Sequence, residues 1–597
     1  MENYAGRSSD LRELLMNDLS ETNDNIDSEV EPVESEESVV VPVGLGASPS
    51  VSQPCDETGD ESDLDVDIYG LTPEHSLTDF SSGSEDDYVP HSSELDTSQR
   101  EVTDLDVGLD VPTVGLGPPA PPPGPGGDAA ARLGIPPIPN ITRPIWTRVY
   151  PPEPEGEDIE TKFTVRNTGI RDCPPRNSKP IAYFNLFFPY AIWMLFTTET
   201  NAYASREVTR RRLSGELRGQ SRLRHWVDVT YSEMKKYIAL VINMGLIGKK
   251  NLIDYWDQSF SQRVPFFPEI MSRNRFQAIS SMFHLTSEPF IAKGEPGYDP
   301  WQKIRKLLDH LNDAFKRHFV PSQNLAIDES MIGMKNRTIF IQYMPNKRHA
   351  RFGIKKFEIC DSATGYLLHT ALYSGKDFLS DGDDPFTQKV IFEMMNQTRL
   401  LGKHHHVFTD NFYTKLPLAE ALLRNDTYLT GTVNKKSKDL SRAVVGTQYE
   451  AGQTVYFRKG KVLLVGYKQK KKRKPVYLIT TACHAEDRNI VSRSGLQAVK
   501  PLVIHKYNLS MGGVDQKDKS IYHHSCTRPT RKYWRKIFFN LMDMAMLNAY
   551  ILYSRNTDHP LSRKRFMVDI VETLVRQQPP AEPVQVNPLE HNLVQFP

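Results

Sequence analysis

The chain has 597 residues and a mass of 68.0 kDa, with a formal net charge of −1. At roughly 100 to 200 residues per domain, this length allows several folded units and excludes a small disulfide-stabilised scaffold. The 5 cysteines are scattered without a CxxC pair, which excludes a sequence-local zinc cage and indicates a reducing compartment.

The small net charge conceals two unlike parts of the chain. Residues 1–110 contain 30 acidic and 3 basic residues, which leaves 44 acidic and 70 basic residues, or +26, for the remainder. The first part is poor in aromatic residues and cannot bury enough apolar surface to fold, so we expect a disordered acidic tail. The basic remainder indicates a polyanionic partner. Screening of the basic body, recruitment of an unknown partner and simple solubilisation all stay open as roles for the tail.

Neither a signal peptide nor a membrane span is expected. The first residues are acidic, and no run reaches the ~18 apolar residues of a spanning helix. We therefore expect a soluble, intracellular protein. The most apolar segment, 537–553, contains Asn540, Asp543 and Asn548, and it is interpreted as a buried helix.

The pattern of residue types along the sequence changes several times after the tail. Aromatic-rich helical periodicity gives way, near residue 323, to short runs bounded by turn residues, and their order (three strands, helix, strand, helix, strand) predicts a mixed α/β sheet covered by helices. A polar, basic stretch then suggests an insertion. The predicted units are the acidic tail 1–110, a Pro/Gly-rich linker 111–178, helices 179–322, the α/β core 323–434, a basic insertion domain 435–501, a return to the core 502–525, further helices 526–575 and a flexible tail 576–597.

Three aspartates stand where this layout would bring them together. Asp328 is predicted to end the first strand, Asp410 ends the fourth, and Asp515 lies near the start of a late helix. Adjacent strands are only ~5 Å apart, so the carboxylates could share a Mg²⁺ ion, with Asp518 on the same helical face as an additional ligand. Each aspartate alone could equally be a turn former or a helix cap. Strand alternation points Glu329 to the opposite face.

Four sequence motifs support a shared site. In order and spacing they resemble the piggyBac family of DDE/D transposases, and the resemblance runs from about residue 179 to about residue 567. It implies an RNase H-like catalytic core with an insertion domain, embedded in a split, mostly helical domain for dimerisation and DNA binding. The motifs are LAIDESMIGM (325–334), YMPNKRHARFGIKKFEICDSATGY (343–366), FTDNFYTKLPLAEALL (408–423) and MGGVDQKD (511–518).

The resemblance also implies an activity. The family's three catalytic, metal-binding aspartates fall on Asp328, Asp410 and Asp515, its accessory acid falls on Asp518, and its tryptophan falls on Trp534. A family enzyme acts in the nucleus as a homodimer on double-stranded DNA. It uses Mg²⁺ (or Mn²⁺) to cut transposon ends, and it joins them at TTAA sites. The cysteine-rich end-recognition module found in many members has no counterpart in residues 576–597, so a domesticated nuclear DNA-binding protein without transposition activity is the alternative.

Basic residues supply the predicted DNA contacts. The run at 468–475 suits phosphate contact or a nuclear localisation signal, with a solvated loop as the plain alternative. Residues 347 and 348 suit backbone contact or a charged edge strand, and Trp534 suits base stacking or the core. The predicted contact residues are Lys347, Arg348, Lys470, Lys471, Lys472, Arg473, Arg531, Lys532, Trp534 and Arg535.

Histidine clusters give no sign of zinc. The run 404–406 precedes a strand whose alternation would separate its side chains, so surface or sheet-edge histidines are expected there. His523, His524 and Cys526 lack a second cysteine pair nearby. We expect no zinc site.

Overall fold

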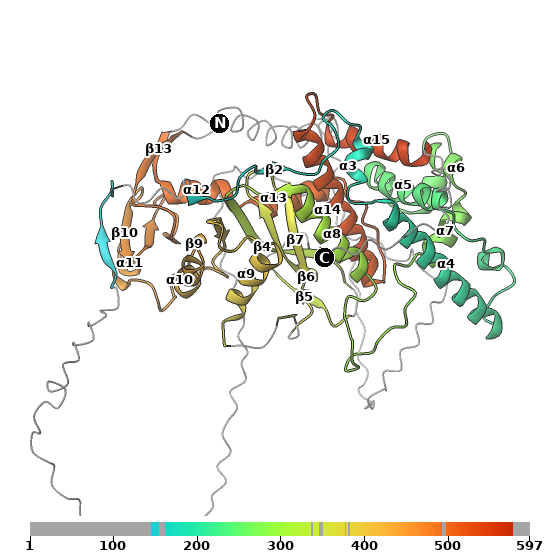
Figure 1. Ribbon diagram of the computed structural model, residues 1–597, viewed down its shortest axis with the longest axis horizontal. Helices are drawn as coiled ribbons and strands as arrows, with labels where there is room; N and C mark the ends of the chain where they lie inside the picture. The colour runs from blue at the N-terminus through green and yellow to red at the C-terminus, as the bar shows by residue number, and fades with distance from the viewer. Residues whose placement is uncertain are drawn as a thin grey trace, which may run out of the picture.

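A mixed ten-stranded sheet forms the centre of the protein, and helices gather at one end of it (Figure 1). The computed structural model describes residues 145–154, 162–335, 338–345, 350–375, 378–379, 383–491 and 497–576. The strands follow the order β1-β10-β11-β12-β9-β8-β4-β6-β5, and β7 also pairs with β6. Within these residues, no helix has the length and apolar character needed to cross a bilayer.

The middle of the sheet has the predicted strand and helix order, which confirms the mixed α/β class. β4 pairs antiparallel with β6 and parallel with β8, and β8 pairs parallel with β9. Parallel neighbours need crossover connections, which here contain helices. The elements are β4 (Asn324–Gly333), β5 (Ile341–Tyr343), β6 (Phe352–Asp361), β7 (Leu367–Leu372), α9 (Phe386–Gln397), β8 (His406–Thr409), α10 (Leu416–Arg424) and β9 (Tyr428–Thr432).

The stretch 435–501 contributes strands to this same sheet. After α11 (Arg442–Gly446), the strands β10 (Thr454–Lys459), β11 (Val462–Tyr467) and β12 (Val476–Thr480) form an antiparallel meander whose last strand pairs with β9. The hairpin β13 (Asp487–Val491) and β14 (Gln497–Pro501) stands as a separate two-stranded sheet. The predicted insertion is therefore continuous with the sheet at β12.

Part of the predicted linker is also structured. β1 (Thr147–Val149) pairs with β10, the Trp146 indole N–H donates to the Asp439 carbonyl over 3.0 Å, and Arg458 binds Glu153 over 2.6 Å. A second short sheet joins β2 (Gly169–Ile170) to β3 (Phe319–Val320). The structure differs from the linker prediction at these points because partners roughly 150 to 300 residues away supply the contacts.

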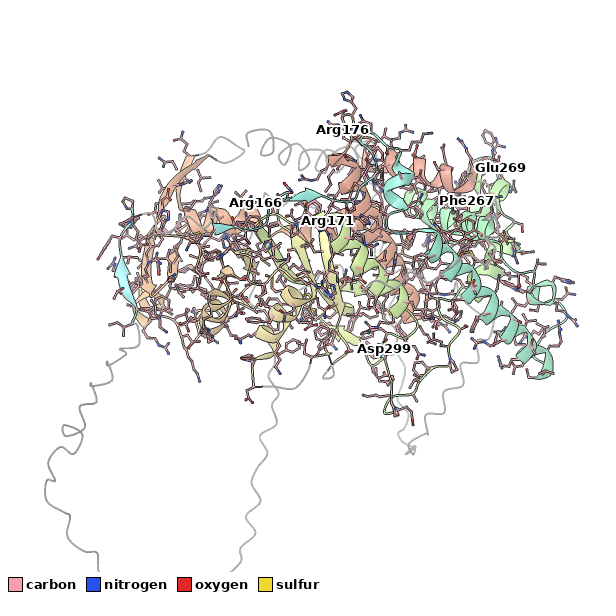
Figure 2. All side chains as sticks on the ribbon, in the orientation of Figure 1. Arg166, Arg171, Arg176, Phe267, Glu269 and Asp299 are labelled. Carbon is pink, nitrogen blue, oxygen red and sulfur yellow. The ribbon has the colours of Figure 1, made fainter. Side chains whose placement is uncertain are left out.

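Arginines hold the segment that precedes α3 (Pro180–Phe184) against the rest of the fold. Figure 2 labels Arg171 and Arg176 in this segment. The Arg171 guanidinium donates to the carbonyls of Lys316 and Arg317 over 3.0 and 2.8 Å, at the end of α8. This places a positive charge at the negative end of a helix. Arg176 forms an ion pair with Asp558, beyond the end of α14.

The helical part is assembled from two stretches of the chain, as the sequence predicts. Thr230 caps α5 by accepting the Glu233 N–H over 3.2 Å, and Gly248 ends that helix with φ 73°. The helices are α3 (Pro180–Phe184), α4 (Tyr190–Leu213), η2 (Arg222–His225), α5 (Tyr231–Ile247), η3 (Ile253–Trp256), α6 (Phe266–Ile270), α7 (Arg273–Met282), α8 (Arg305–His318), α12 (Leu502–Ser510), α13 (Gly513–His523), α14 (Tyr533–Arg555) and α15 (Arg563–Arg576).

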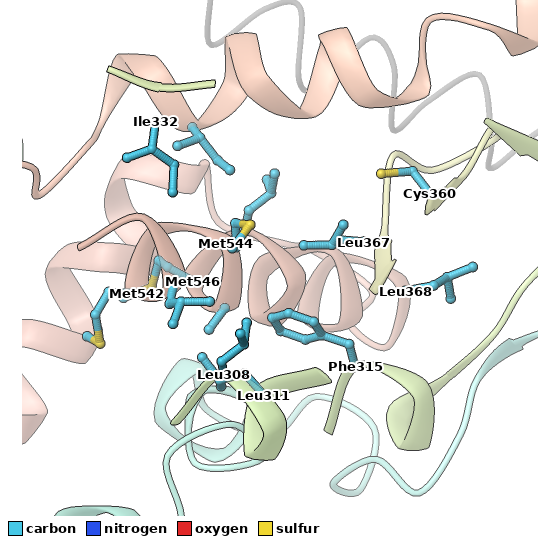
Figure 3. Close-up of a cluster of buried hydrophobic side chains, with 14 of the residues drawn as sticks. Leu308, Leu311, Phe315, Ile332, Cys360, Leu367, Leu368, Met542, Met544 and Met546 are labelled. Carbon is cyan, nitrogen blue, oxygen red and sulfur yellow. The ribbon is translucent and has the colours of Figure 1, made fainter. Parts of the chain in front are cut away.

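α14 lies between the helices and the sheet, and it is buried over almost its whole length (Figure 3). Met542, Met544 and Met546 pack in one cluster with side chains from α8 and from β7. The predicted burial of 537–553 is thus confirmed. α14 therefore joins the two stretches of helices to the strands.

Two buried asparagines hold the free edge of β7. The Asn548 side chain of α14 accepts the Leu367 N–H over 3.0 Å and donates to the Leu367 carbonyl over 2.9 Å. Asn312 of α8 makes the same pair of hydrogen bonds with Thr370, each over 3.0 Å. Each side chain replaces the backbone of a missing neighbouring strand, so the edge is satisfied without another strand.

Replacing Asn548 by leucine should therefore destabilise the fold. The apolar side chain leaves the Leu367 N–H and carbonyl buried and unpaired, at a cost of about 2 to 5 kcal/mol. Urea denaturation of Asn548→Leu measures this cost. Asn396→Leu, at an exposed position of α9, is the control and should change the free energy of unfolding by no more than about 0.5 kcal/mol. Equal stability of the two variants would contradict the edge-capping role.

Asp543 gives the fold a pH dependence. It is 4% exposed, and burial raises its pKa to about 6, although Cys526 N–H and the Ser525 hydroxyl donate to it over 3.0 and 2.6 Å. Because the folded-state pKa exceeds the unfolded value, this group stabilises the fold fully below about pH 4, and the contribution is lost as the pH rises through about 6.

The wild type should lose stability relative to Asp543→Asn as the pH rises. Between pH 5 and pH 8 the difference in unfolding free energy should shift by about 1.4 kcal/mol against the wild type. Urea denaturation of both proteins at the two pH values measures the shift. An unchanged difference would show that Asp543 titrates alike in both states.

Candidate metal centre

Two of the predicted aspartates belong to a pair of adjacent parallel strands, one inside its strand and the other directly after its strand. In the parallel pair of β4 and β8, Ala326 is aligned with Phe408. Asp410 directly follows β8, as predicted. Asp328, however, lies inside β4 and not at its end, because β6 pairs with β4 over its whole length. Asp328 is 7% exposed.

The third aspartate comes from the helix that covers this face of the sheet. A Cβ on Gly513 would lie 3.2 Å from the Ala326 Cβ, so α13 begins almost in contact with β4. Ala326 and Asp328 are two residues apart and share a face of the strand, the face on which α13 lies. Asp515 is exposed in the first turn of α13. The structure therefore places the start of α13, which carries Asp515, against the strand that carries Asp328.

Local hydrogen bonds orient the two strand carboxylates. Asp328 Oδ1 accepts the Glu329 N–H over 2.8 Å, and Asp410 Oδ1 accepts the Phe412 N–H over 2.9 Å. The Tyr413 hydroxyl donates to Glu329 Oε2 over 2.8 Å. Burial raises the Tyr413 pKa well above its usual value, and the charges of Glu329, Asp328 and Asp410 raise it further.

The donor set suits a hard divalent cation. Mg²⁺ takes oxygen ligands, keeps several waters and needs only one or two carboxylates when phosphate supplies the remaining ligands. As the side chains stand, no three His, Cys, Asp or Glu residues of the described ranges converge closely enough to hold an ion. The strand pair and α13 place the carboxylates nearby, and binding would require them to turn toward one another.

A buried ionic network lies beside the aspartates, and the sequence analysis missed it. Glu358 on β6 is the cross-strand partner of Asp328, and Lys356 is that of Ser330. Lys356 binds Glu358 over 2.8 Å, and Lys517 of α13 contacts both Glu358 and Asp518. No local sequence signal indicated it, because lysines are rarely buried and the network depends on the pairing of β4 with β6 and on the packing of α13.

A threonine clamp fixes the chain just after Asp410. The Thr414 N–H and hydroxyl donate to the Asp410 carbonyl over 3.0 and 2.6 Å, and the hydroxyls of Thr409 and Thr414 lie 2.7 Å apart. Gly431 on β9 leaves room for this clamp. A Cβ there would overlap the Thr414 hydroxyl and lie 2.6 Å from the Thr409 carbonyl oxygen.

The predicted DNA-contact residues have different environments. Lys347 and Arg348 lie outside the described residues. Lys470, Lys471 and Lys472 are exposed in the turn between β11 and β12, where Arg473 is half-buried.

Near the start of α14, Arg531 is exposed and Lys532 is half-buried. Trp534 is 2% exposed and stacks on Phe283 with 6.2 Å between ring centroids, so it belongs to the core in this structure. The Arg535 guanidinium donates to nearby backbone carbonyls, including that of Phe283 over 3.4 Å.

The histidines at 405 and 406 are not at the surface, which corrects the sequence prediction. Both are buried, and a His406 ring nitrogen lies 2.7 Å from the Thr430 hydroxyl. Burial lowers the pKa of His406 to about 3, so the ring is neutral. The sheet extends beyond β8 to β9 and β12, and these strands enclose a position that would otherwise have been an edge.

Replacing Gly431 by alanine should disturb the clamp behind Asp410. The added methyl must displace Thr414 or the β8 backbone, and we expect a loss of about 1 to 3 kcal/mol of stability. Gly446→Ala, where a Cβ would meet nothing within 4 Å, is the matched control. Guanidinium denaturation of both variants measures the difference. If Gly431→Ala is as stable as the control, the clamp is not closely packed.

Comparisons with known proteins identify the family of the chain. A family model described as Transposase IS4 matches residues 179–550. The human PiggyBac transposable element-derived protein 5 is 22% identical over 416 residues, covering 67% of this chain and 76% of its own. The human PiggyBac transposable element-derived protein 3 is 24% identical over 384 residues, covering 62% of this chain and 63% of its own.

The fold has a counterpart among solved structures. A piggyBac transposase, solved by cryo-EM as a synaptic complex with hairpin DNA, aligns with a TM-score of 0.60 and 25% sequence identity. The alignment covers 69% of this chain and 83% of that one. The Transposase IS4 family model matches more than half of the residues, so the chain belongs to that transposase family. Its similarity to the piggyBac proteins makes it a piggyBac-type member.

Proposed function

We propose that this protein is a piggyBac-type DNA transposase that cleaves and joins DNA strands at TTAA sites, with Asp328, Asp410 and Asp515 holding Mg²⁺ or Mn²⁺. The observation that carries the proposal is the parallel pairing of β4, which contains Asp328, with β8, which Asp410 directly follows. The helix that bears Asp515 covers that same face. Membership of the transposase family supports this use of the three acids.

Each part of the site has a role in this chemistry. When bound, a divalent cation activates the attacking oxygen and stabilises the leaving oxygen of a phosphoryl transfer. Asp328 is fixed by its place inside β4, and the threonine clamp fixes the backbone of Asp410. Asp515 lies in the first turn of α13, where the helix dipole favours a negative charge. The backbone positions of the three aspartates are therefore held by the fold, and their side chains would turn toward a bound ion.

The proposed substrate is double-stranded DNA, both transposon ends and a TTAA target. The exposed lysines Lys470, Lys471 and Lys472 and the exposed Arg531 support phosphate contacts. The solved relative was captured with hairpin DNA. We further propose that β4 to β9 form an RNase H-like core with residues 435–501 as its insertion, that two copies act as a homodimer, and that the protein works in the nucleus.

A second function is a DNA-binding protein that keeps the fold without transposing. The human relatives are named as transposable element-derived proteins, and the acids of the described residues do not converge as they stand. On this proposal, salt-sensitive DNA binding persists and Mg²⁺ has no effect on it. The same cleavage assay separates the two functions.

Asp410→Asn should abolish cleavage. Removing one ligand charge takes several kcal/mol from the transition state, so we expect at least a roughly 100-fold loss of Mg²⁺-dependent cutting of a TTAA duplex that carries the flanking sequences of the gene. DNA affinity, measured by fluorescence anisotropy, should stay within about threefold, because the basic surface is unchanged. Asp439→Asn, at an exposed position after β9, is the matched control. Cutting at the wild-type rate by Asp410→Asn would refute the assignment.

A further inference from the structure

Two lysines are buried beside the proposed metal ligands. The side chains of Lys356 on β6 and Lys517 on α13 are each 1% exposed, and both bind the fully buried Glu358. Lys356 Nζ lies 2.8 Å from Glu358 Oε1, and Lys517 Nζ contacts Glu358 Oε2. Burying an ammonium group is costly unless an opposite charge compensates it. One glutamate compensates only one of the two lysines.

Asp518 supplies the second negative charge. Its Oδ1 lies 2.6 Å from Lys517 Nζ, and its side chain is 36% exposed. Burial alone would raise the pKa of Asp518, but Lys517, Lys356 and the Ser330 hydroxyl outweigh that effect and lower it. Asp518 is therefore ionised. Burial lowers the pKa of Lys356, whereas for Lys517 the effect of burial is outweighed by Asp518 and Glu358, which raise its pKa, so Lys517 is the cation with which Asp518 pairs.

The network lies between β4, which carries Asp328, and α13, which carries Asp515. Glu358 is aligned with Asp328 across the β4–β6 pair, and Lys517 lies two residues after Asp515. If Asp518 turned away to bind a metal ion, the buried Lys517 would lose one of its two acidic partners. The pairing with Lys517 thus opposes the use of Asp518 as a metal ligand.

We propose that Lys517 is a positioning residue that withdraws Asp518 from the metal ligands. A divalent cation is then held by Asp328, Asp410 and Asp515 alone, and it is bound more weakly because a fixed positive charge lies nearby. The inference rests on the proposed function only in taking these three residues as ligands. It assigns the fourth family acid a structural partner within this chain.

Mn²⁺ binding to the full chain tests the proposal, with isothermal titration calorimetry as the readout. Lys517→Met leaves Glu358 paired with Lys356, releases Asp518 and removes a positive charge, so Mn²⁺ should bind roughly tenfold tighter or more. Adding Asp518→Asn should cancel that gain and return the affinity to within about threefold of the wild type. Lys461→Met, in the exposed turn between β10 and β11, removes the same charge elsewhere and should change nothing.

Two outcomes would overturn the proposal. One is an unchanged affinity in folded Lys517→Met. The other is a double variant that binds Mn²⁺ at least roughly tenfold more weakly than the wild type, which would make Asp518 a ligand already. If Lys517→Met does not fold, as judged by circular dichroism, Lys517→Gln asks the same question, because it removes the same charge beside Asp518 and keeps a polar side chain.

Cleavage assays on the same proteins report separately on the proposed function. A wild type that shows this Mn²⁺ pattern but cuts no DNA would refute the transposase proposal and support the role of Lys517. If the wild type binds no Mn²⁺, the inference stands only when Lys517→Met gains binding that Asp518→Asn then removes. Absence of binding in both proteins refutes it.

Discussion

Close packing of α13 on β4 is the contact on which the candidate centre depends. Gly513 and Ala326 meet where a larger side chain on either would force the elements apart. The contact joins parts of the chain separated by nearly 190 residues, and it brings Asp515, Lys517 and Asp518 over the strand that carries Asp328. Small residues at this crossing let charged side chains, and not an apolar layer, fill the space beside it.

The buried charged side chains stabilise the fold less than an apolar core of similar volume often would. Replacing a buried ionic network with apolar side chains of similar volume is often neutral or favourable, whereas removing one partner costs about 3 to 5 kcal/mol. Lys356 and Glu358 on β6 and Lys517 on α13 are nevertheless all buried. Stability alone therefore does not account for them. Their place beside Asp328 and Asp515 gives them an electrostatic effect that an apolar core would lack.

Local patterns predicted the sheet well where the neighbouring strands come from nearby sequence. β4, β6, β7, β8 and β9 each have an apolar run bounded by turn residues, and all were predicted. β1 has three residues and depends on partners near residue 457, which no local pattern reveals. The same limit applies to His406, whose burial follows from strands that join the sheet on its far side.

The candidate site was predictable in its acids and not in its cations. Aspartates at strand ends and helix starts are visible in a sequence, and the parallel pairing of β4 with β8 assigns two of them to a pair of adjacent strands. Lysines are rarely buried, so a prediction from the sequence alone would place Lys356 and Lys517 at the solvent-exposed surface. Only the cross-strand pairing of β4 with β6, and the position of α13 above it, place both lysines against Glu358.

This arrangement also bears on how a phosphate could approach the acids. Asp328, Asp410 and Asp515 together repel an anionic backbone, and a bound cation would offset that repulsion only while it is present. Lys517 is fixed in the fold between Glu358 and Asp518, so its charge is poorly screened by salt, whereas burial lowers the pKa of Lys356. The cation at Lys517 offsets part of the negative charge of Glu358 and Asp518 beside the three aspartates. The surrounding basic surface can then attract DNA at long range, while the local charge at the sheet stays low enough for a phosphate to reach it.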